Sequence, residues 1–235
     1  MFGFLKISGN HAKSFLQGQL TCDVNEVNEE QSCLGAHCNL KGRVLFNFRL
    51  SLEDNHYFLK LPLLMLQTAK TRLLKFAVFS QVSIEIDPRI EKTGLLEKNL
   101  VDEIKKGFAT IYPETSGLFT PHELNFQHWH LISFTKGCYT GQEVVARMEY
   151  LGKLKKHLRL ASFSSKETPS RAHHCFNENL EQETGVLVDW IKTENERYLL
   201  LILLDDSAEN THNYYCFDQT DAPIKLNFES FSGSS

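Results

Sequence analysis

The order of short apolar segments in the N-terminal part of the chain constrains its fold most strongly. Residues 44–50 alternate apolar and polar side chains, a pattern typical of a half-buried antiparallel strand. The face that we expect to point into a core consists of Val44, Phe46, Phe48 and Leu50. Further strand patterns occupy residues 2–7, 33–38, 56–61 and 82–86, and amphipathic helical patterns occupy residues 12–20 and 63–76. The order β-α-β-β-β-α-β predicts an α+β fold of antiparallel sheets with packed helices.

Charge and motifs exclude several functional classes. The 235 residues carry 25 Lys and Arg against 29 Asp and Glu, a net charge of -4, so direct nucleic-acid binding is not expected. No GxGxxG or P-loop string is present, so a dinucleotide-binding or P-loop fold is not predicted either. The basic run 153–159 is best interpreted as a solvated face, with contact to phosphates as the alternative.

The same basic run marks a change of charge that suggests a domain boundary. Residues 1–159 hold 20 basic against 16 acidic side chains, and residues 160–235 hold 5 against 13. We therefore predict an α+β domain over residues 1–151, with two subdomains that divide near residues 87–95. Residues 152–235 alternate apolar runs with polar turns, which predicts a small antiparallel β-barrel domain.

Composition also predicts the location and the redox state of the protein. No segment approaches the roughly 20 apolar residues of a membrane span, and the start lacks the order of a signal peptide. We expect a cytoplasmic monomer with no membrane association. The cysteines are then expected to be thiols rather than disulfides; they are Cys22, Cys33, Cys38, Cys138, Cys175 and Cys216.

The string KGCYTGQEVVAR is the most informative for chemistry. The spacing of Thr140 and Glu143 predicts a capping box at a helix start, two residues after Cys138. The helix N-terminus and an inward-pointing Lys136 ammonium would lower the pKa of the Cys138 thiol. Glycines at 137 and 141 would let a ligand approach the backbone closely. A small buried cysteine with no chemical role is an equally good interpretation of these residues alone.

Four elements in order between residues 15 and 147 resemble one known family. They are FLQGQLTCDV, AHCNLKGR, GLFTPHELN and KGCYTGQE. The chain thus resembles the YgfZ family of folate-binding proteins, which are relatives of the T protein of the glycine cleavage system. The resemblance implies an aminomethyltransferase-like fold with a C-terminal barrel, and tetrahydrofolate or another folate as cofactor. It also implies a role in maintaining iron-sulfur proteins such as tRNA methylthiolation enzymes, with indirect effects on tRNA modification.

The resemblance also implies the residues of the site. Cys138 would be the residue needed for activity. The folate-binding residues would be Lys41, Gly42, Arg43, Lys136, Gly137, Tyr139, Gly141, Gln142, Glu143 and Arg147. The first element adds Gln17, Gly18, Gln19, Thr21 and Asp23. Phe2 stands where some relatives have tryptophan, and its ring could stack on a pteridine.

Two functions from different classes follow from the resemblance. The first is a folate-dependent accessory protein for iron-sulfur cluster assembly or repair, not a conventional enzyme. The alternative is a folate-dependent aminomethyl transferase with an aspartate, Asp23 or Asp102, as the acidic group. Residues 103–106 replace the RxEAG string that transferases favour, which argues for the first. We expect no metal site, because Cys33, His37 and Cys38 on one strand would point to opposite faces.

Overall fold

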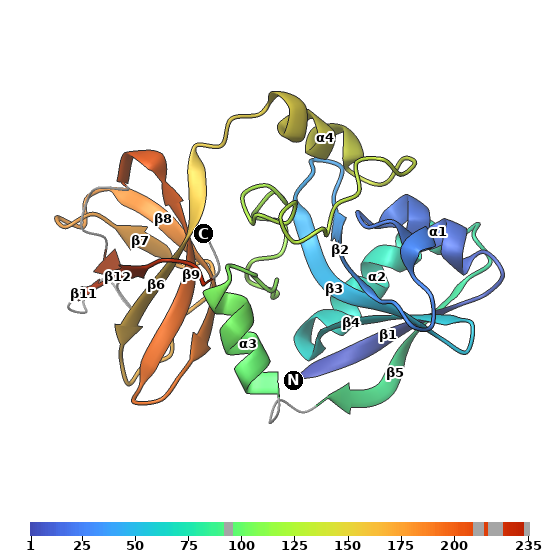
Figure 1. Cartoon of the computed structure of the whole chain (residues 1–235), viewed down its shortest axis with the longest axis horizontal. Coiled ribbons are helices and arrows are strands. Elements are labelled where there is room, and N and C mark those ends of the chain that lie inside the picture. Colours follow the sequence, from blue (N-terminus) through green and yellow to red (C-terminus); the bar gives the residue numbers. More distant parts are fainter. Residues whose placement is uncertain (92–95, 209–213, 216–222, 233–235) are drawn as a thin grey trace. The chain divides into compact units, whose positions relative to one another are not determined.

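The computed structural model describes residues 1–91, 96–208, 214–215 and 223–232. The chain forms two compact units (Figure 1). The first consists of Met1–Gly94, Ile111–His122 and Phe126–Gly152. The second consists of Leu95–Thr110, Glu123–Asn125 and Lys153–Ser235. Both units are built around antiparallel sheets, so the predicted α+β class is confirmed.

The first unit contains a five-stranded antiparallel sheet of order β2-β3-β4-β1-β5. Its strands are β1 (Phe2–Ser8), β2 (Cys33–Cys38), β3 (Val44–Glu53), β4 (His56–Pro62) and β5 (Ser83–Glu91). Its α-helices are α1 (Ala12–Gln19), α2 (Leu66–Ala77) and α4 (Gln142–Leu151), and its short 3-10 helices are η1 (Val24–Glu26) and η2 (Leu63–Met65). The predicted order of strands and helices in residues 2–86 is confirmed.

Two amphipathic helices supply one side of the core of this unit. Helix α1 buries Phe15 and Leu16, and α2 buries Leu66 and Leu73. These side chains join one apolar cluster with the inward faces of β1, β3 and β4. Each large apolar side chain that is fully buried contributes about 1.5–3 kcal/mol, so this cluster fixes both helices on the sheet.

The opposite face of β3 is buried as well, contrary to the sequence-based expectation. Leu45 and Asn47 were expected to face outward, yet both are buried. The segment that follows Ile111 covers them, because the Ile111 amide donates to Asn47 Oδ1 at 2.9 Å and Ser116 Oγ donates to the Leu45 carbonyl at 2.7 Å. Alternation within one strand cannot reveal a cover that is more than sixty residues away in sequence.

The second unit contains a seven-stranded sheet of order β11-β10-β7-β8-β9-β6-β12. Its strands are β6 (Lys156–Ser164), β7 (His174–Phe176), β8 (Glu183–Lys192), β9 (Arg197–Asp205), β10 (Tyr214–Tyr215), β11 (Ile224–Lys225) and β12 (Asn227–Glu229). It also holds α3 (Leu96–Lys105) and the 3-10 helix η3 (Asp206–Ala208). Strand β9 is buried from Tyr198 to Leu204, in agreement with its continuous apolar run.

One short segment reaches both edges of this sheet. Residues 224–225 pair with β10, and residues 227–229 pair with β6. A closed barrel requires a pairing of this kind between the first and last strands. The C-terminal barrel itself stays a prediction.

The division into units differs from the predicted domains in two segments, residues 95–110 and residues 123–125. The boundary at Gly152 lies one residue from the predicted one. Helix α3, however, packs on β8 and β9, and the Thr110 amide donates to Asp189 Oδ2 at 2.9 Å. These contacts place residues 95–110 in the second unit. The predicted break near residues 87–95 falls partly outside the described residues.

The capping-box spacing of Thr120 and Glu123 predicts a short helix that starts there, but the structure has none at this place. Residues 121–130 form successive turns. Asn125 and His130 both have a φ of 56°, a left-handed conformation that interrupts helical hydrogen bonding. The capping-box spacing of Thr120 and Glu123 therefore marks a turn rather than a helix.

The described residues also bear on membrane association and thiol state. None of the helices in the described ranges is long and apolar enough to span a membrane. Five of the cysteines are free thiols, and Cys216 lies outside the described residues.

Candidate functional site

Three of the matched sequence elements meet at Gly141. This glycine is the N-cap of α4 and has a φ of 85°. A Cβ there would lie 2.5 Å from the Asn39 carbonyl oxygen and 3.2 Å from Cys38 Cβ. On another side, the Thr140 amide donates to the Gly18 carbonyl at 3.2 Å. We call the three segments together the motif cluster; it comprises residues 17–19, 39–43 and 136–143.

The turn at residues 39–43 is closed by the side chain of its first residue. Asn39 Oδ1 accepts hydrogen bonds from the Lys41 amide at 2.9 Å and the Arg43 amide at 3.0 Å. Gly42 has a φ of 68°, and a Cβ there would lie 2.9 Å from Val144 Cβ. Both glycines are therefore needed for the close approach of this turn to the start of α4.

The fourth matched element runs beside the same turn. The Val44 amide donates to the Phe119 carbonyl at 2.8 Å, and the Gly117 amide donates to the Val44 carbonyl at 2.7 Å. Arg43 Nη1 donates to the Leu118 carbonyl at 2.7 Å. All four elements on which the family resemblance rests are thus connected by hydrogen bonds within the first unit.

Residues of the first element stabilise the backbone that supports the cluster. Gln17 Nε2 donates to Asp23 Oδ1 at 2.9 Å, and Gln17 Oε1 accepts from the Val24 amide at 2.8 Å. Asp23 also caps η1 through the Asn25 amide, and this hydrogen bond is the main reason that the pKa of its carboxyl is lowered. Thr21 is buried, and its Oγ1 donates to the Leu131 carbonyl at 2.6 Å. In this arrangement Asp23 has a capping role.

Lys136 has a structural position inside the first unit. It is buried, and its Nζ donates to the carbonyls of Leu20 at 2.9 Å and Cys22 at 2.7 Å. The Tyr139 ring lies beneath the ammonium, with the centroid 5.4 Å from Nζ. Burial lowers the pKa of Lys136, and the nearby Cys22 and Asp23 oppose this shift. The ammonium thus links residues 136–143 to the backbone at Leu20 and Cys22, directly after α1.

Cys138 lies at an exposed position three residues before the N-cap of α4. The predicted cap at Thr140 is wrong, because Gly141 is the N-cap and makes no side-chain cap. Thr140 Oγ1 donates instead to Gln19 Oε1 at 3.2 Å. Exposure argues against the alternative that Cys138 is a buried structural cysteine.

Two motif glycines border open space. A Cβ at Gly137 or Gly18 would have no neighbour within 4 Å. Internal packing therefore gives no reason for glycine at either position. Without a side chain, the backbone at both positions is open to solvent and to an approaching molecule.

The hydroxyl of Tyr139 is the polar atom of the cluster that fits a ligand best. It is buried and has no hydrogen-bond partner within the described part of the chain. Burial also raises the pKa of this phenol, so it stays protonated and can donate. A folate carries ring nitrogens and carbonyl groups that accept such a bond, and exposed Lys41 and Arg147 suit its carboxylates. The residues present thus fit a folate.

The remaining predicted residues have different surroundings. Glu143 is exposed in the first turn of α4. Gln142 is half-buried, and its backbone N–H donates to the Tyr139 carbonyl at 3.1 Å. Phe2 lies in β1, opposite Pro62 of β4 and Glu91 of β5. The ammonium of Lys60 is 5.7 Å from the Phe2 ring centroid. The sheet partners of Phe2 are therefore not residues of the motif cluster.

The candidate metal ligands on β2 are occupied or buried. His37 is buried with Nδ1 2.9 Å from the Gln19 carbonyl, and burial raises the pKa of Cys38 to about 12. Nowhere in the described ranges do three His, Cys, Asp or Glu side chains gather as a metal site would require. Asp102 lies in α3, within the second unit, so the two candidate aspartates come from different units.

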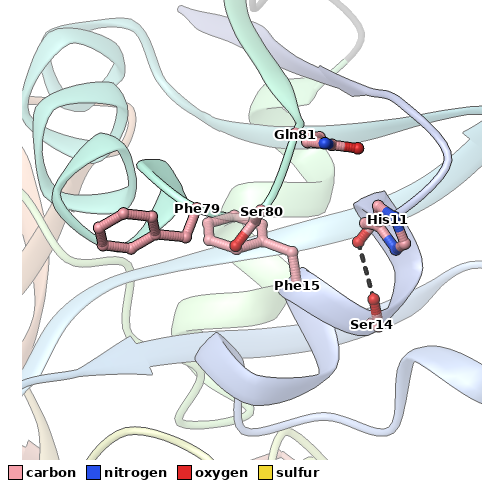
Figure 2. Close-up of a pocket in the computed structure, with 6 residues that line it drawn as sticks. All are labelled: His11, Ser14, Phe15, Phe79, Ser80 and Gln81. Carbon is pink, nitrogen blue, oxygen red and sulfur yellow. Dashed lines mark hydrogen bonds between the residues drawn. The ribbon is translucent and has the colours of Figure 1, made fainter.

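A separate surface pocket of about 370 Å³ lies between α1 and the turn after α2 (Figure 2). Its lining consists of His11, Ser14, Phe15, Phe79, Ser80 and Gln81. Ser14 Oγ donates to the His11 carbonyl at 3.0 Å, as the dashed line in Figure 2 shows. None of the predicted site residues lines this pocket.

Sequence reasoning missed a pair of thiols beside Lys136. Cys22 and Cys33 shift each other's pKa, and the Lys136 ammonium favours the thiolate form of both. These cysteines are separated from Lys136 by more than one hundred residues. No spacing motif reveals such a contact, and the even number of cysteines was the one available signal.

His37 provides a pH-dependent contribution to stability. Burial lowers the pKa of its imidazole in the folded state, so the unfolded chain takes up a proton first as the pH falls. This contribution to stability is fully present above the pKa of about 6.5 that histidine has in the unfolded chain. It is lost as the pH falls toward the pKa of His37 in the folded state. Below about pH 6.5, the free energy of unfolding should fall by up to about 1.4 kcal/mol per pH unit until the folded-state pKa is reached. In urea titrations His37→Gln should flatten this slope, and an unchanged slope would contradict the assignment.

Comparison with known proteins identifies the family. No protein-family model matches the chain. A tRNA-modifying protein YgfZ from Colwellia psychrerythraea is 32% identical over 245 aligned positions, which cover 77% of this chain and 71% of the relative. The corresponding protein from Vibrio atlanticus is 31% identical, with 77% of this chain and 72% of the relative covered.

A solved structure confirms the predicted aminomethyltransferase-like fold. The glycine cleavage system aminomethyltransferase T from Bartonella henselae matches with a TM-score of 0.69 and 13% identity. The match covers 97% of this chain and 83% of that protein. This likeness concerns the fold, whereas the sequence identity to the curated relatives concerns the family. On that identity the chain belongs to the YgfZ family.

Proposed function

We propose that this protein is a folate-binding accessory factor linked to tRNA modification, in which Cys138 carries the chemical step. The relatives bear the name tRNA-modifying protein, and the fold is that of an aminomethyltransferase. The single observation that carries the proposal is the motif cluster, where packed segments present an exposed thiol. In this proposal the clients are iron-sulfur enzymes such as those that methylthiolate tRNA, and the protein acts in the cytoplasm.

The folate would contact the motif cluster from its open side. The Tyr139 hydroxyl would donate a hydrogen bond to a ring acceptor, and Gly137 would let the ring approach the backbone. Lys41 and Arg147 would pair with the carboxylates of the glutamate tail. When bound, the folate would supply a one-carbon or reducing centre, while the chain would supply the binding surface and the thiol.

Calorimetric titration with tetrahydrofolate tests the binding step. The wild-type protein and Cys138→Ser should bind with the same affinity, because the thiol is not part of the proposed folate contacts. Lys41→Glu should raise the dissociation constant by a factor of about two to five, which corresponds to the loss of one exposed ion pair. Lys75→Glu on the exposed face of α2 is the matched control and should leave the affinity unchanged. Absence of binding by the wild-type protein would contradict the folate assignment.

The cellular role needs a separate readout. Bacterial cells that lack their own YgfZ-family protein should regain methylthiolated adenosine in their tRNA when they express this chain, but not when they express Cys138→Ser. Full rescue by Cys138→Ser would show that the thiol has no part in the function. Folate binding by the wild-type protein and by Cys138→Ser can be measured first. A failed rescue can therefore be distinguished from a failure to fold.

The aminomethyl transferase alternative rests on the fold match alone. It predicts turnover, which the accessory role does not. Formation of methylenetetrahydrofolate from an aminomethyl donor, followed by absorbance with the purified protein, distinguishes the two. Turnover that depends on Cys138 would favour a transferase.

A further inference from the structure

Cys22 and Cys33 lie on the same side of β2, next to the position where Gly35 lacks a side chain. Leu20 forms an isolated antiparallel bridge with His37, and Thr21 exchanges hydrogen bonds with Ala36 through its amide and its hydroxyl. This register places Cys22 opposite Gly35. A Cβ on Gly35 would lie only 2.5 Å from Cys22 Sγ. The thiol of Cys22 therefore occupies the volume that a side chain at position 35 would fill.

Cys33 lies on the same face of β2, two residues before Gly35. Alternate residues of a strand point to the same side, so the Cys33 side chain lies on the face of β2 where the Cys22 thiol packs over Gly35. Cys22 is buried and Cys33 is half-buried, and both pack against the core of the first unit. A small solute thus reaches Cys33 more readily than Cys22.

The charges around the pair favour a thiolate on Cys33. The hydrogen bond from Cys22 is the main cause that lowers the pKa of Cys33, and the cations Arg49 and Lys136 act in the same direction. Burial and Glu26 oppose them. The same thiol pair raises the pKa of Cys22, together with its burial. One thiol is therefore the better nucleophile, and its neighbour stays protonated.

We propose that Cys22 and Cys33 form a hydroperoxide-sensitive dithiol, a redox site distinct from the exposed Cys138. The Cys33 thiolate attacks the peroxide; an S–O bond forms, the O–O bond breaks, and the departing hydroxide is protonated to water. Cys22 sulfur then attacks the resulting sulfenic acid; the S–S bond forms, the S–O bond breaks, and the hydroxide leaves as water with the Cys22 proton. In sum, two thiols are oxidised to a disulfide and one hydrogen peroxide is reduced to two waters.

Peptide mapping of the folded wild-type protein tests the proposal without any substitution. The full chain is treated with increasing hydrogen peroxide, its free thiols are alkylated, and the digest is analysed by mass spectrometry. We expect the peptide that carries both cysteines to lose two hydrogen masses, and fragmentation to place the link between Cys22 and Cys33. A thiol reductant should reverse it. Oxidation of Cys33 to sulfinic acid without any link would overturn the proposal.

Two variants separate this link from other pairings. Cys33→Ser should abolish the disulfide, because no second thiol then faces Cys22. Cys38→Ala is the matched control, since Cys38 lies buried on the same strand and should leave the link unchanged. A link between Cys22 and Cys38 in the wild-type protein, or a disulfide that persists in Cys33→Ser, would contradict the assignment.

Discussion

Gly141→Ala is expected to lower the free energy of unfolding of the first unit by about 2–5 kcal/mol. A left-handed conformation costs a non-glycine residue about 1–2 kcal/mol, and an overpacked contact adds about 1–3 kcal/mol. Here φ is 85°, and the new Cβ would meet the Asn39 carbonyl oxygen at 2.5 Å. Because backbone atoms cannot rotate away, the turn at residues 39–43 must separate from α4.

Gly137→Ala is the matched control for this prediction. It lies in the same motif, but a Cβ there meets no atom within 4 Å. Its effect should stay within about 0.5 kcal/mol. The chain has two tryptophans, and Trp129 belongs to the first unit, so urea unfolding of a Trp190→Phe background by fluorescence reports on this unit. Equal destabilisation by both alanines would contradict the packing argument.

Asp189→Ala should destabilise the second unit by about 3–5 kcal/mol, the usual effect of breaking a buried ion pair. The Asp189 carboxylate is buried and accepts hydrogen bonds from Arg171 Nε at 2.9 Å and from the Trp190 amide at 2.8 Å. Its second oxygen accepts from the Thr110 amide at 2.9 Å. Removal of the carboxylate leaves a guanidinium and two amides without these acceptors.

An exposed aspartate of the same unit provides the comparison. Asp206 pairs with His157 at 3.2 Å, and its side chain is 48% exposed, so Asp206→Ala should change the stability by less than about 1 kcal/mol. Fluorescence of Trp190 in a Trp129→Phe background follows unfolding of this unit. A difference of less than 1 kcal/mol between the two variants would show that the Asp189 network is not a major source of stability.

The local alternation of apolar and polar residues was sufficient to predict most strands of the first sheet. It gave wrong burial where residues far away in sequence cover a strand. Strand β3 was predicted from alternation, yet the burial of Asn47 depends on the segment after Ile111. The turns at residues 121–130 have helix-start spacing, but left-handed Asn125 and His130 prevent a helix. Helix α3 belongs to the second unit because it packs on β8 and β9, and its local sequence does not reveal these contacts.

The sequence was sufficient to predict which segments form the candidate site, but not how their side chains are arranged. KGCYTGQE and AHCNLKGR resemble family motifs, and the structure joins them through Gly141 and the turn after Asn39. The direction of Lys136 was not predictable, because its acceptors are backbone carbonyls at Leu20 and Cys22. Backbone carbonyls have no sequence signature, so a buried lysine in a motif is readily mistaken for a group that serves the neighbouring cysteine.

The hydrogen bond between Thr110 and Asp189 has a consequence for synthesis on the ribosome. The two residues are 79 positions apart. At the usual elongation rate of about 5–20 residues per second, roughly 4–16 s pass between their emergence. During that interval α3 lacks the strands on which it packs. A nascent chain that ends before β8 would therefore expose the face of α3 that β8 and β9 cover in the folded protein.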